Sequence, residues 1–267
     1  MSQLITPGDF TAETLSFQKP INGGSPNTFR IPIGAVKDGR KLPSLFIATP
    51  TVYSFGVSPQ ANIGEKVDEN LSNVKYYTLP LCLHSKTGPT AEEAGFVDLF
   101  NRIVESCKTY LIRKDVNEVL GKFGDDQITH VDLKKMNPLY YKKVLGKIVD
   151  GTGPILYPKL IMRKDGTSCV TTFSDTNNTH HDFKSLLNRR MNVRCALKLE
   201  SIFVGSKISL QFKVYEINYK LINMSGPTRL LADLPVQIGA GSDDRDEQDD
   251  TIHDWPPGSN IDHQART

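Results

Sequence analysis

The chain has 267 residues, of which 38% are hydrophobic and 23% are charged. This length allows one large domain with a substantial core. No apolar run reaches the roughly 18–20 residues that a membrane-spanning helix needs. The first residues, MSQLITPGDFTAE, lack the charged and apolar regions of a secretory signal. We therefore expect a soluble, intracellular protein that is not secreted and has no membrane partner.

Charge is distributed unevenly along the chain. The whole sequence has 32 basic and 30 acidic residues, a formal net charge of +2. Residues 241–267 contain eight acidic and two basic residues, a net −6, so residues 1–240 carry a net +8. A basic body attracts phosphate backbones, whereas an acidic block with few apolar residues does not fold. We expect residues 226–267 to be a disordered acidic tail attached to a basic domain.

The N-terminal part of the chain is predicted to be rich in β-structure after a short arm. Residues 1–27 are polar and contain Pro and Gly, so we expect a flexible N-terminal arm. The run from 29 to 58 alternates apolar and polar residues around Asp38-Gly39, a dipeptide that favours a tight hairpin. Residues 73–84, NVKYYTLPLCLH, are a further strand candidate.

One amphipathic helix is predicted next. Thr90 and Glu93 form a capping-box pattern that marks a helix N-terminus. Apolar residues then recur at helical spacing, at Phe96, Phe100, Ile103, Cys107 and Leu111. The pattern continues with Val116, Val119 and Leu120 and ends at Gly121 and Gly124. The following residues, 125–153, are lysine-rich and ambiguous, and we expect short helical pieces around residues 138–148.

β-Structure returns in the second half of the chain. Two β-rich runs flank Asp165-Gly166, a second hairpin signal. Residues 193–221 give the longest β pattern, with Gly205-Ser206 as a two-residue turn. Their alternation shifts phase near Glu200-Ser201 and near Val214-Tyr215, and each shift needs a β-bulge if the sheet keeps its register. Long strands bent in this way suit a small closed barrel.

These elements predict a mainly β fold with one to three helices. About eight short strands without β-α-β alternation favour an OB-like, partly open Greek-key barrel. We expect it to cover residues 28–225, with a helical insertion near residues 90–150; a plain β-sandwich is the alternative. The cysteines are far apart, sit in apolar segments and form no C-x-x-C pair, so they are expected to be reduced core residues. They are Cys82, Cys107, Cys169 and Cys195.

The sequence contains no motif for catalysis or for a cofactor. It has no G-x-x-x-x-G-K-[ST], G-x-G-x-x-G, G-x-S-x-G or H-E-x-x-H. His180-His181-Asp182 lies in a polar loop where adjacent side chains point apart, so a metal site is the less favoured interpretation. The same holds for Asp125-Asp126 with His130, because a nuclease site needs carboxylates that converge from separate elements. We expect no enzyme activity, no cofactor and no metal.

Basic residues interleave with aromatic residues in KYY (75–77), KKMNPLYYKKVLGK (134–147) and LYPKLIMRK (156–164). In single-strand binders, cations follow the phosphates and aromatic rings stack on unpaired bases. This texture and the polar face of the 193–214 hairpin predict binding of single-stranded DNA, with RNA as an alternative ligand. Lysines that only keep a sheet soluble, and tyrosines that only pack, are the competing interpretation. The candidate binding residues are Lys75, Tyr76, Tyr77, Lys134, Lys135, Tyr140, Tyr141, Lys142, Lys143, Tyr157, Lys159, Arg163, Lys164, Arg194, Lys198, Lys207 and Lys213.

The acidic tail fits this interpretation. A flexible polyanion tied to a basic groove would occupy the groove until nucleic acid displaces it, and the released tail would recruit replication proteins through Trp255. The layout resembles bacterial and phage single-strand-binding proteins, in which an acidic tail follows an OB barrel. Their tails often end in an aromatic residue, whereas Trp255 lies twelve residues before the end of this sequence.

Two segments carry a second resemblance. The segment GPILYPKLIMRKDGTSCVTTFSD, followed after a polar spacer by RCALKLESIFVGSKISLQFKVYEI, is similar to the C-terminal half of a viral protein family. These are the single-stranded-DNA-binding proteins of nucleocytoplasmic large DNA viruses, of the asfarvirus and iridovirus type. The similarity covers roughly residues 153–221, with a looser echo in PLCL (80–83). It implies a replication protein without a cofactor in the host cytoplasm or the viral replication factory.

Together these observations predict a non-enzymatic, sequence-tolerant single-stranded-DNA-binding protein for viral DNA replication, repair or recombination. The alternative is a β-barrel virion or structural protein whose tail only solubilises it.

Overall fold

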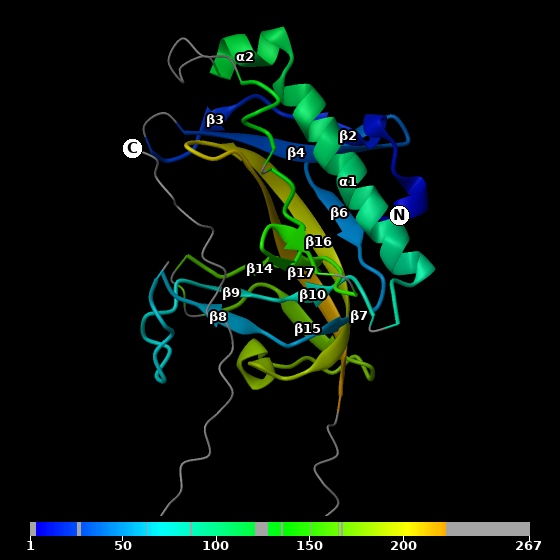
Figure 1. The fold of residues 1–267 in the computed structure, drawn as a ribbon, viewed down its shortest axis with the longest axis vertical. Coiled ribbons are helices and arrows are strands. Elements are labelled where there is room, and N and C mark those ends of the chain that lie inside the picture. The colour runs from blue at the N-terminus through cyan, green and yellow to red at the C-terminus, as the bar shows by residue number, and fades with distance from the viewer. Residues whose placement is uncertain are drawn as a thin grey trace, which may run out of the picture.

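A computed structural model describes residues 4–25, 28–62, 64–85, 87–120, 128–134, 136–149, 151–164, 166 and 168–222 (Figure 1). This part of the chain is mainly β, with two α-helices and three 3-10 helices. The predicted acidic tail (226–267), the helix-ending Gly121 and Gly124, Lys135 and the Asp125-Asp126 pair lie outside the described residues.

Fifteen strands belong to one large, curled sheet, and two further strands form a separate small pair. The large sheet contains β1 (Leu4–Ile5), β2 (Leu15–Phe17), β3 (Ile21–Asn22), β4 (Phe29–Lys37), β5 (Arg40–Leu42), β6 (Leu45–Ala48), β7 (Val52–Ser54), β8 (Ser58–Gln60), β9 (Tyr76–Thr78), β10 (Leu81–Cys82), β13 (Ile155–Leu156), β14 (Lys159–Leu160), β15 (Thr172–Asp175), β16 (Met191–Val204) and β17 (Ser209–Leu221). The small pair is β11 (Lys143–Val144) and β12 (Lys147–Ile148). The helices are α1 (Ala91–Leu111), α2 (Lys114–Leu120), η1 (Pro7–Asp9), η2 (Ala12–Thr14) and η3 (Phe183–Leu186).

The long antiparallel hairpin of β16 and β17 forms the centre of the sheet. Its register shifts twice, so that Glu200 and Tyr215 are each an extra residue without a partner in the opposite strand. These are the two predicted bulges, and they confirm that the phase shifts in the sequence mark bends. The connection is longer than predicted, because residues 205–208 separate the two strands in place of a two-residue turn at Gly205-Ser206.

Two prolines divide what would otherwise be one pair of longer strands. β9 and β10 continue each other across Pro80, and β13 and β14 continue each other across Pro158. A proline has no N–H to donate to a ladder, so each strand is interrupted there. The pairing nevertheless runs on in a constant register, because the Leu79 N–H donates to Pro158 O at 3.0 Å between the β9–β14 and β10–β13 pairs.

The strand pairs close into a ring. β7 pairs with β16 and with β10, the interrupted strands β9/β10 and β13/β14 pair with each other, and β14 pairs with β17. Numbered along the chain, the ring has the order first (β7), second (β9/β10), third (β13/β14), fifth (β17), fourth (β16). The third and fifth strands are parallel and the other neighbours are antiparallel. This five-stranded arrangement agrees with the predicted OB-like barrel.

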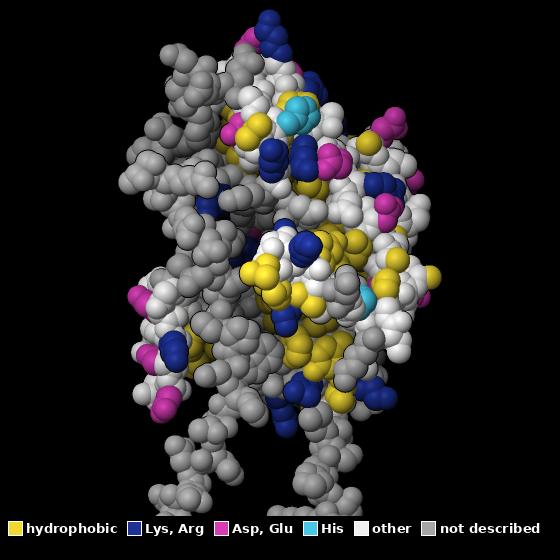
Figure 2. Space-filling view, viewed as in Figure 1, with side chains coloured by type: hydrophobic (Ala, Val, Ile, Leu, Met, Phe, Trp, Pro, Cys, Tyr) yellow, Lys and Arg dark blue, Asp and Glu magenta, His cyan; other side chains and the backbone are white. Residues whose placement is uncertain are grey.

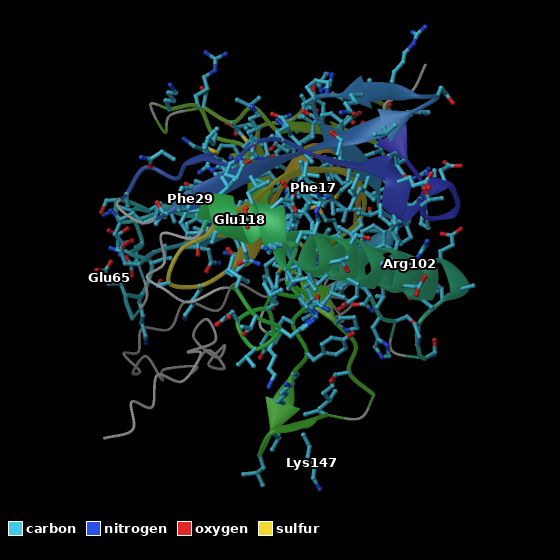
Figure 3. All side chains as sticks on the ribbon, turned by 90° about the horizontal axis from the view of Figure 1, so that it is seen from above. Phe17, Phe29, Glu65, Arg102, Glu118 and Lys147 are labelled. Carbon is cyan, nitrogen blue, oxygen red and sulfur yellow. The ribbon has the colours of Figure 1, made fainter. Side chains whose placement is uncertain are left out.

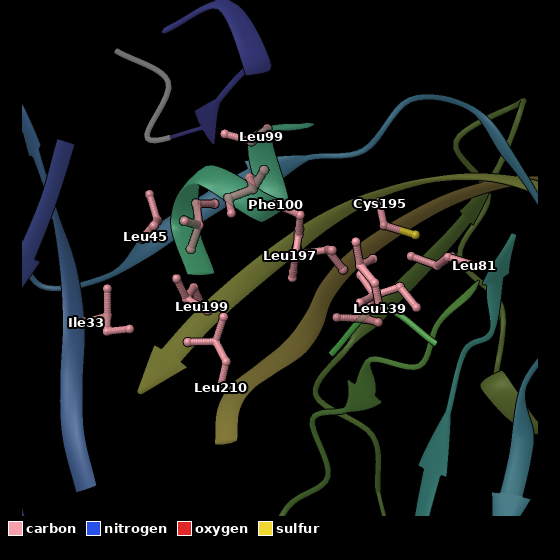
Figure 4. Packing of buried hydrophobic residues seen from close by; sticks show 14 of the residues in the cluster. Ile33, Leu45, Leu81, Leu99, Phe100, Leu139, Cys195, Leu197, Leu199 and Leu210 are labelled. Atoms are coloured by element: carbon pink, nitrogen blue, oxygen red, sulfur yellow. The ribbon is translucent and has the colours of Figure 1, made fainter. Parts of the chain in front are cut away.

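Helix α1 covers the wider part of the sheet. Its predicted apolar stripe is buried, and the Phe100 ring lies edge-on to Phe212 of β17 with centroids 5.6 Å apart. Figure 4 shows Phe100 on the side of the helix that faces Leu197 of β16 in the core. The capping box is present, with the Thr90 N–H donating to Glu93 and the Glu93 N–H donating to Thr90. The prediction that one helix continues to Leu120 was wrong, because α1 ends at Leu111 and a separate short helix, α2, follows.

The N-terminal segment differs from the predicted flexible arm. β1 pairs in parallel with β6, and β2 pairs with β4. Phe10 is buried, and its carbonyl oxygen accepts a hydrogen bond of 3.0 Å from Arg102 of α1. Phe17 stacks on Tyr110 with ring centroids 4.0 Å apart. Contacts with α1 therefore hold a segment whose polar composition alone indicated an arm.

The lysine-rich region also differs from its prediction. Residues 143–148, expected to be helical, form the β11–β12 hairpin, with Leu145 and Gly146 at φ 50° and 79° in its turn. Positive φ at both central residues is typical of a tight hairpin turn and incompatible with a helix. The predicted turn at Asp38-Gly39 is confirmed, because Lys37 pairs with Arg40 across it. Asp165 of the second predicted turn lies outside the described residues. An antiparallel bridge between Met162 and Cys169 shows that the chain reverses direction between them.

The cysteines divide into two groups. Cys107 and Cys195 are buried, as predicted, and burial raises the pKa of Cys107 to about 12. Cys82 and Cys169 are only half-buried, so the expectation of four core cysteines was wrong for these two. Burial, and next the nearby Glu93, raise the pKa of Cys82 to about 11. All four are free thiols.

The capping box of α1 gives a stability test. Replacing Thr90 with Ala removes the acceptor for the Glu93 N–H, and we expect the free energy of unfolding to fall by about 1 kcal/mol. Urea unfolding followed by circular dichroism measures the change. Thr176→Ala, at an exposed turn residue, is the matched control, and an equal effect of both substitutions would contradict the capping role.

Candidate nucleic-acid interface

Each of the two interrupted strands, β9/β10 and β13/β14, has one side facing the core and the other facing away from it. Leu79, Leu81 and Leu156 are fully buried and point into the barrel. The intervening residues point outward, and among them Tyr157 is exposed. Because neighbours across a ladder share one side of a sheet, Tyr76, Thr78, Cys82, Ile155, Tyr157 and Lys159 lie on the side that faces away from the barrel interior, where Thr78 is itself buried.

Three lysines continue this surface across adjacent strands. Lys198 of β16 lies opposite Lys213 of β17, which in turn lies beside Lys159 of β14. Phe46 lies opposite Lys198 at one end of the row, and Thr78 lies opposite Lys159 at the other. Adjacent strands are about 4.8 Å apart, so three positive charges are held at short spacing on one face. Directly opposed like charges destabilise a sheet in the absence of counter-charge.

Among the described residues, one ion pair partly neutralises the row. Glu200, the bulge residue of β16, forms an ion pair of 3.0 Å with Lys213. The ammonium of Lys159 lies 3.9 Å from the centroid of the Tyr76 ring, in a cation–π contact. Lys159 keeps an exposed surface, but burial by the surrounding protein, and next the charge of Lys213, lower its pKa. An anion bound here would favour the charged form of Lys159 and relieve the repulsion within the row.

Two exposed tyrosines lie next to the lysine row. Tyr140 and Tyr157 are 38% and 43% exposed, and their rings make an edge contact with centroids 6.1 Å apart. Tyr140 is fixed by two backbone hydrogen bonds with Ile155, of 2.9 and 2.8 Å. Tyr157 precedes Lys159 by two residues and therefore shares its side of the strand. We call this surface the basic–aromatic face, defined by Tyr76, Tyr140, Tyr157, Lys159, Lys198 and Lys213.

The β11–β12 hairpin projects beside Tyr140 and is here called the finger (residues 142–149). Its base is closed by a hydrogen bond of 3.0 Å from the Val149 N–H to Lys142 O. Figure 3 shows the finger projecting from the body of the protein, with Lys147 near its end. Lys142, Lys143 and Lys147 are exposed on it. In Figure 2, hydrophobic side chains gather in the middle of the molecule with Lys and Arg side chains next to them.

The structure brings together only some of the predicted residues. Tyr77 points away from the face and packs against Phe183, with ring centroids 4.9 Å apart, and Tyr141 packs against the core. The remaining predicted cations are exposed and lie outside the face as defined, although Arg194 shares the outer side of β16 with Lys198. They are Lys75 before β9, Lys134 in the 128–134 segment, Arg163 and Lys164 at the turn after β14, Arg194 on β16 and Lys207 in the β16–β17 connection.

Two aromatic pairs near the face were missed. Phe46 and Tyr215 make an edge contact at 4.9 Å next to the lysine row. Tyr53 of β7 lies opposite Cys82 and contacts Phe55 at 5.1 Å. Phe46 and Tyr215 come from distant parts of the chain, and Tyr215 lies at a bulge. The alternation of apolar and polar residues does not show which side of the sheet faces outward there. The alternation in the sequence grouped Tyr215 with Ile217 and Tyr219, whereas the bulge turns Tyr215 outward and leaves the other two buried.

The structure offers little support for a metal site. Within the described residues, no three His, Cys, Asp or Glu side chains lie close enough to hold a metal ion. His181 instead contacts Asp175, with its Nε2 3.2 Å from the carboxylate. Asp175 is at the same time an acceptor for the Thr179 N–H at 3.0 Å. This part of the predicted His180-His181-Asp182 loop therefore stabilises a turn.

The sequence of this chain is similar to that of a known protein family. A family model described as "Protein of unknown function (DUF2738)" matches residues 15–251. The chain belongs to this family.

Two viral proteins are similar to this member of DUF2738. The "Early 31 kDa protein" of Frog virus 3 (isolate Goorha) is 28% identical over 203 residues, covering 75% of this chain and 72% of the relative. The "Uncharacterized protein 007R" of Invertebrate iridescent virus 3 is 27% identical over 179 residues, covering 66% of this chain and 35% of the relative. The predicted relationship to iridovirus proteins is therefore confirmed. None of the helices in the described part of the chain is long and apolar enough to cross a membrane.

The lysine row predicts an unusual effect on stability. Lys198→Thr removes the like charge opposite Lys213, so we expect the free energy of unfolding to rise by about 0.2–1 kcal/mol at low salt. The matched control is Lys220→Thr, because Lys220 lies opposite the neutral Asn192. Thr favours strands at both positions, so the difference between the variants isolates the charge. Thermal unfolding at low and high salt measures it, and a difference that does not shrink as salt screens the charges would exclude repulsion as its cause.

Proposed function

We propose that this protein binds single-stranded DNA without catalysis and without sequence preference, during viral DNA replication, repair or recombination. The observation that carries the proposal is the basic–aromatic face, where three lysines on adjacent strands lie beside exposed tyrosines. Lysines follow phosphates, and aromatic rings stack on any unpaired base because every base has a flat π-face. This combination suits a flexible single strand better than a duplex, whose bases are already stacked.

The position of the face supports the same ligand. OB barrels bind oligonucleotides on the face of the second and third strands and on the loops between the first and second and the fourth and fifth. In this protein the second and third strands carry Tyr76, Tyr157 and Lys159. Lys207 lies in the connection between the fourth and fifth strands. Lys207 is therefore a predicted residue outside the face that lies on a loop of the kind that OB barrels use for binding.

The charge distribution supports a role for the tail. Residues 241–267 carry a net −6 and residues 1–240 a net +8. We propose that the tail shields the basic–aromatic face when DNA is absent, and that its release recruits replication proteins through Trp255. The relatives are proteins of Frog virus 3 and Invertebrate iridescent virus 3, and we propose a site of action in the host cytoplasm or the viral replication factory.

Binding of labelled poly-dT over a series of salt concentrations tests the function. We expect binding to weaken steeply with salt, because phosphate contacts release counter-ions. Tyr157→Ala should weaken binding by about 1–3 kcal/mol, the usual contribution of one stacked base. Tyr157→Phe is the matched control, since it keeps the ring and should retain most of the affinity.

Three outcomes of this experiment count against the proposal. Wild-type protein that does not bind poly-dT, or binds independently of salt, would favour the alternative of a virion or structural protein. Equal binding by Tyr157→Ala and wild type would remove the stacking role of the face. Much tighter binding of poly-U than of poly-dT would make RNA the ligand.

Truncation after Gly241 tests the shielding role of the tail. Removing the −6 segment leaves the +8 body, so we expect tighter binding of poly-dT because a tethered competitor no longer opposes it. The gain should be largest at low salt and disappear near about 0.3 M, where both attractions are screened. A tail that only solubilises predicts unchanged affinity and aggregation of the truncated protein. Weaker binding after truncation would show that the tail contributes to the binding site.

A further inference from the structure

The tip of the finger is strongly exposed and apolar. Leu145 is 98% exposed, Val144 57% and Ile148 49%. Leu145 also has φ 50°, a left-handed conformation that is unfavourable for a leucine and ordinary for Asn or Gly. The chain therefore places an apolar residue where neither backbone preference nor packing within the described residues favours it. Such a position indicates contact with something other than the barrel.

The charge around the tip restricts what that contact can be. Lys142, Lys143 and Lys147 are exposed along the two strands of the finger. An apolar tip flanked by cations complements a ligand that offers flat apolar surfaces beside regularly spaced negative charges. Unpaired bases on their phosphate backbone have this chemistry.

The base of the finger leads directly to the basic–aromatic face. Tyr140 is bonded to Ile155 and contacts Tyr157, and the finger begins two residues after Tyr140. Leu145 at the tip is three positions after Lys142, so the tip extends about 10 Å beyond the base at the usual strand rise. A strand of DNA that stacks on Tyr140 and Tyr157 would pass within reach of the tip.

We infer that the finger inserts Val144 and Leu145 between neighbouring bases of bound DNA and unstacks them. Apolar wedges of this kind separate base steps in other DNA-binding proteins at a cost of a few kcal/mol per step, which additional protein–DNA contacts offset. Here the lysines of the finger and the lysine row supply those contacts. The inference rests on the proposed function and adds to it that the protein actively holds strands apart, opposing their return to a duplex.

The test uses the full chain and an oligo-dA that contains 2-aminopurine, whose fluorescence rises when it loses its stacked neighbours. Wild-type protein at saturation should raise the fluorescence and lower the melting temperature of a short duplex with a single-stranded overhang. In the double variant Val144→Thr/Leu145→Asn we expect the fluorescence rise to fall below about half of the wild-type value and most of the effect on melting to disappear, because no apolar wedge enters the step. Asn followed by Gly146 is a favoured hairpin turn, so the finger should still form.

Val119→Thr is the matched control, because Val119 is also 57% exposed but lies on α2, a different element from the finger. It should behave like wild type in both assays. Circular dichroism and thermal unfolding establish that each variant is folded.

The outcomes separate the inference from the function on which it rests. If wild-type protein does not bind the oligonucleotide, the proposed function itself is wrong. If wild type binds and the double variant gives the same fluorescence and the same melting effect, the function stands and the wedge is excluded. If the double variant changes only the cooperativity of binding, with unchanged fluorescence per bound protein, the tip contacts a neighbouring copy of the protein and the inference is overturned.

Discussion

The pairing of β16 with β17 is the interaction on which the rest of the structure depends. Each strand of this hairpin uses its second edge for other partners: β16 pairs with β4, β6 and β7, while β17 pairs with β14 and β15. A straight hairpin of this length would give an open, gently twisted sheet. The extra residues at Glu200 and Tyr215 bend it and increase its twist, so that β7 and β14 come round far enough to be joined by the two interrupted strands.

The same two bulges shape the candidate site. Glu200, freed from the ladder, pairs with Lys213 and partly neutralises the lysine row. Tyr215 is turned outward to contact Phe46 beside that row. The residues that allow the barrel to close therefore also arrange charge and aromatic surface on its outside. A change that straightened the hairpin would alter the shape of the barrel and the proposed interface together.

The sequence predicts the features that depend on neighbouring residues and misses those that depend on contacts between distant segments. The capping box of α1, the Asp38-Gly39 turn and the bulges depend on neighbouring residues, and all were predicted. The parallel pairing of β14 with β17 joins distant segments, so the alignment of Lys159 with Lys213 and Lys198 could not be derived from spacing alone. The N-terminal segment was misjudged because its order comes from contacts such as Arg102 with Phe10. The finger was misjudged because Leu145 occupies a turn position that sequence preferences assign to other residues.

The prolines that interrupt the second and third strands have a consequence for how the barrel moves. Pro154 and Pro158 accept from the Leu83 and Leu79 N–H groups but have no N–H to donate in return, so the seam between these strands has fewer hydrogen bonds than the β16–β17 hairpin. Local opening in native proteins starts where strands are held by the fewest hydrogen bonds and contacts. Amide hydrogen exchange should therefore be faster along the seam that carries Tyr76 and Tyr157 than along the β16–β17 hairpin. An oligonucleotide bound across the seam would hold its two strands together. The slowing of amide exchange along the seam would then report how long each strand of DNA stays bound.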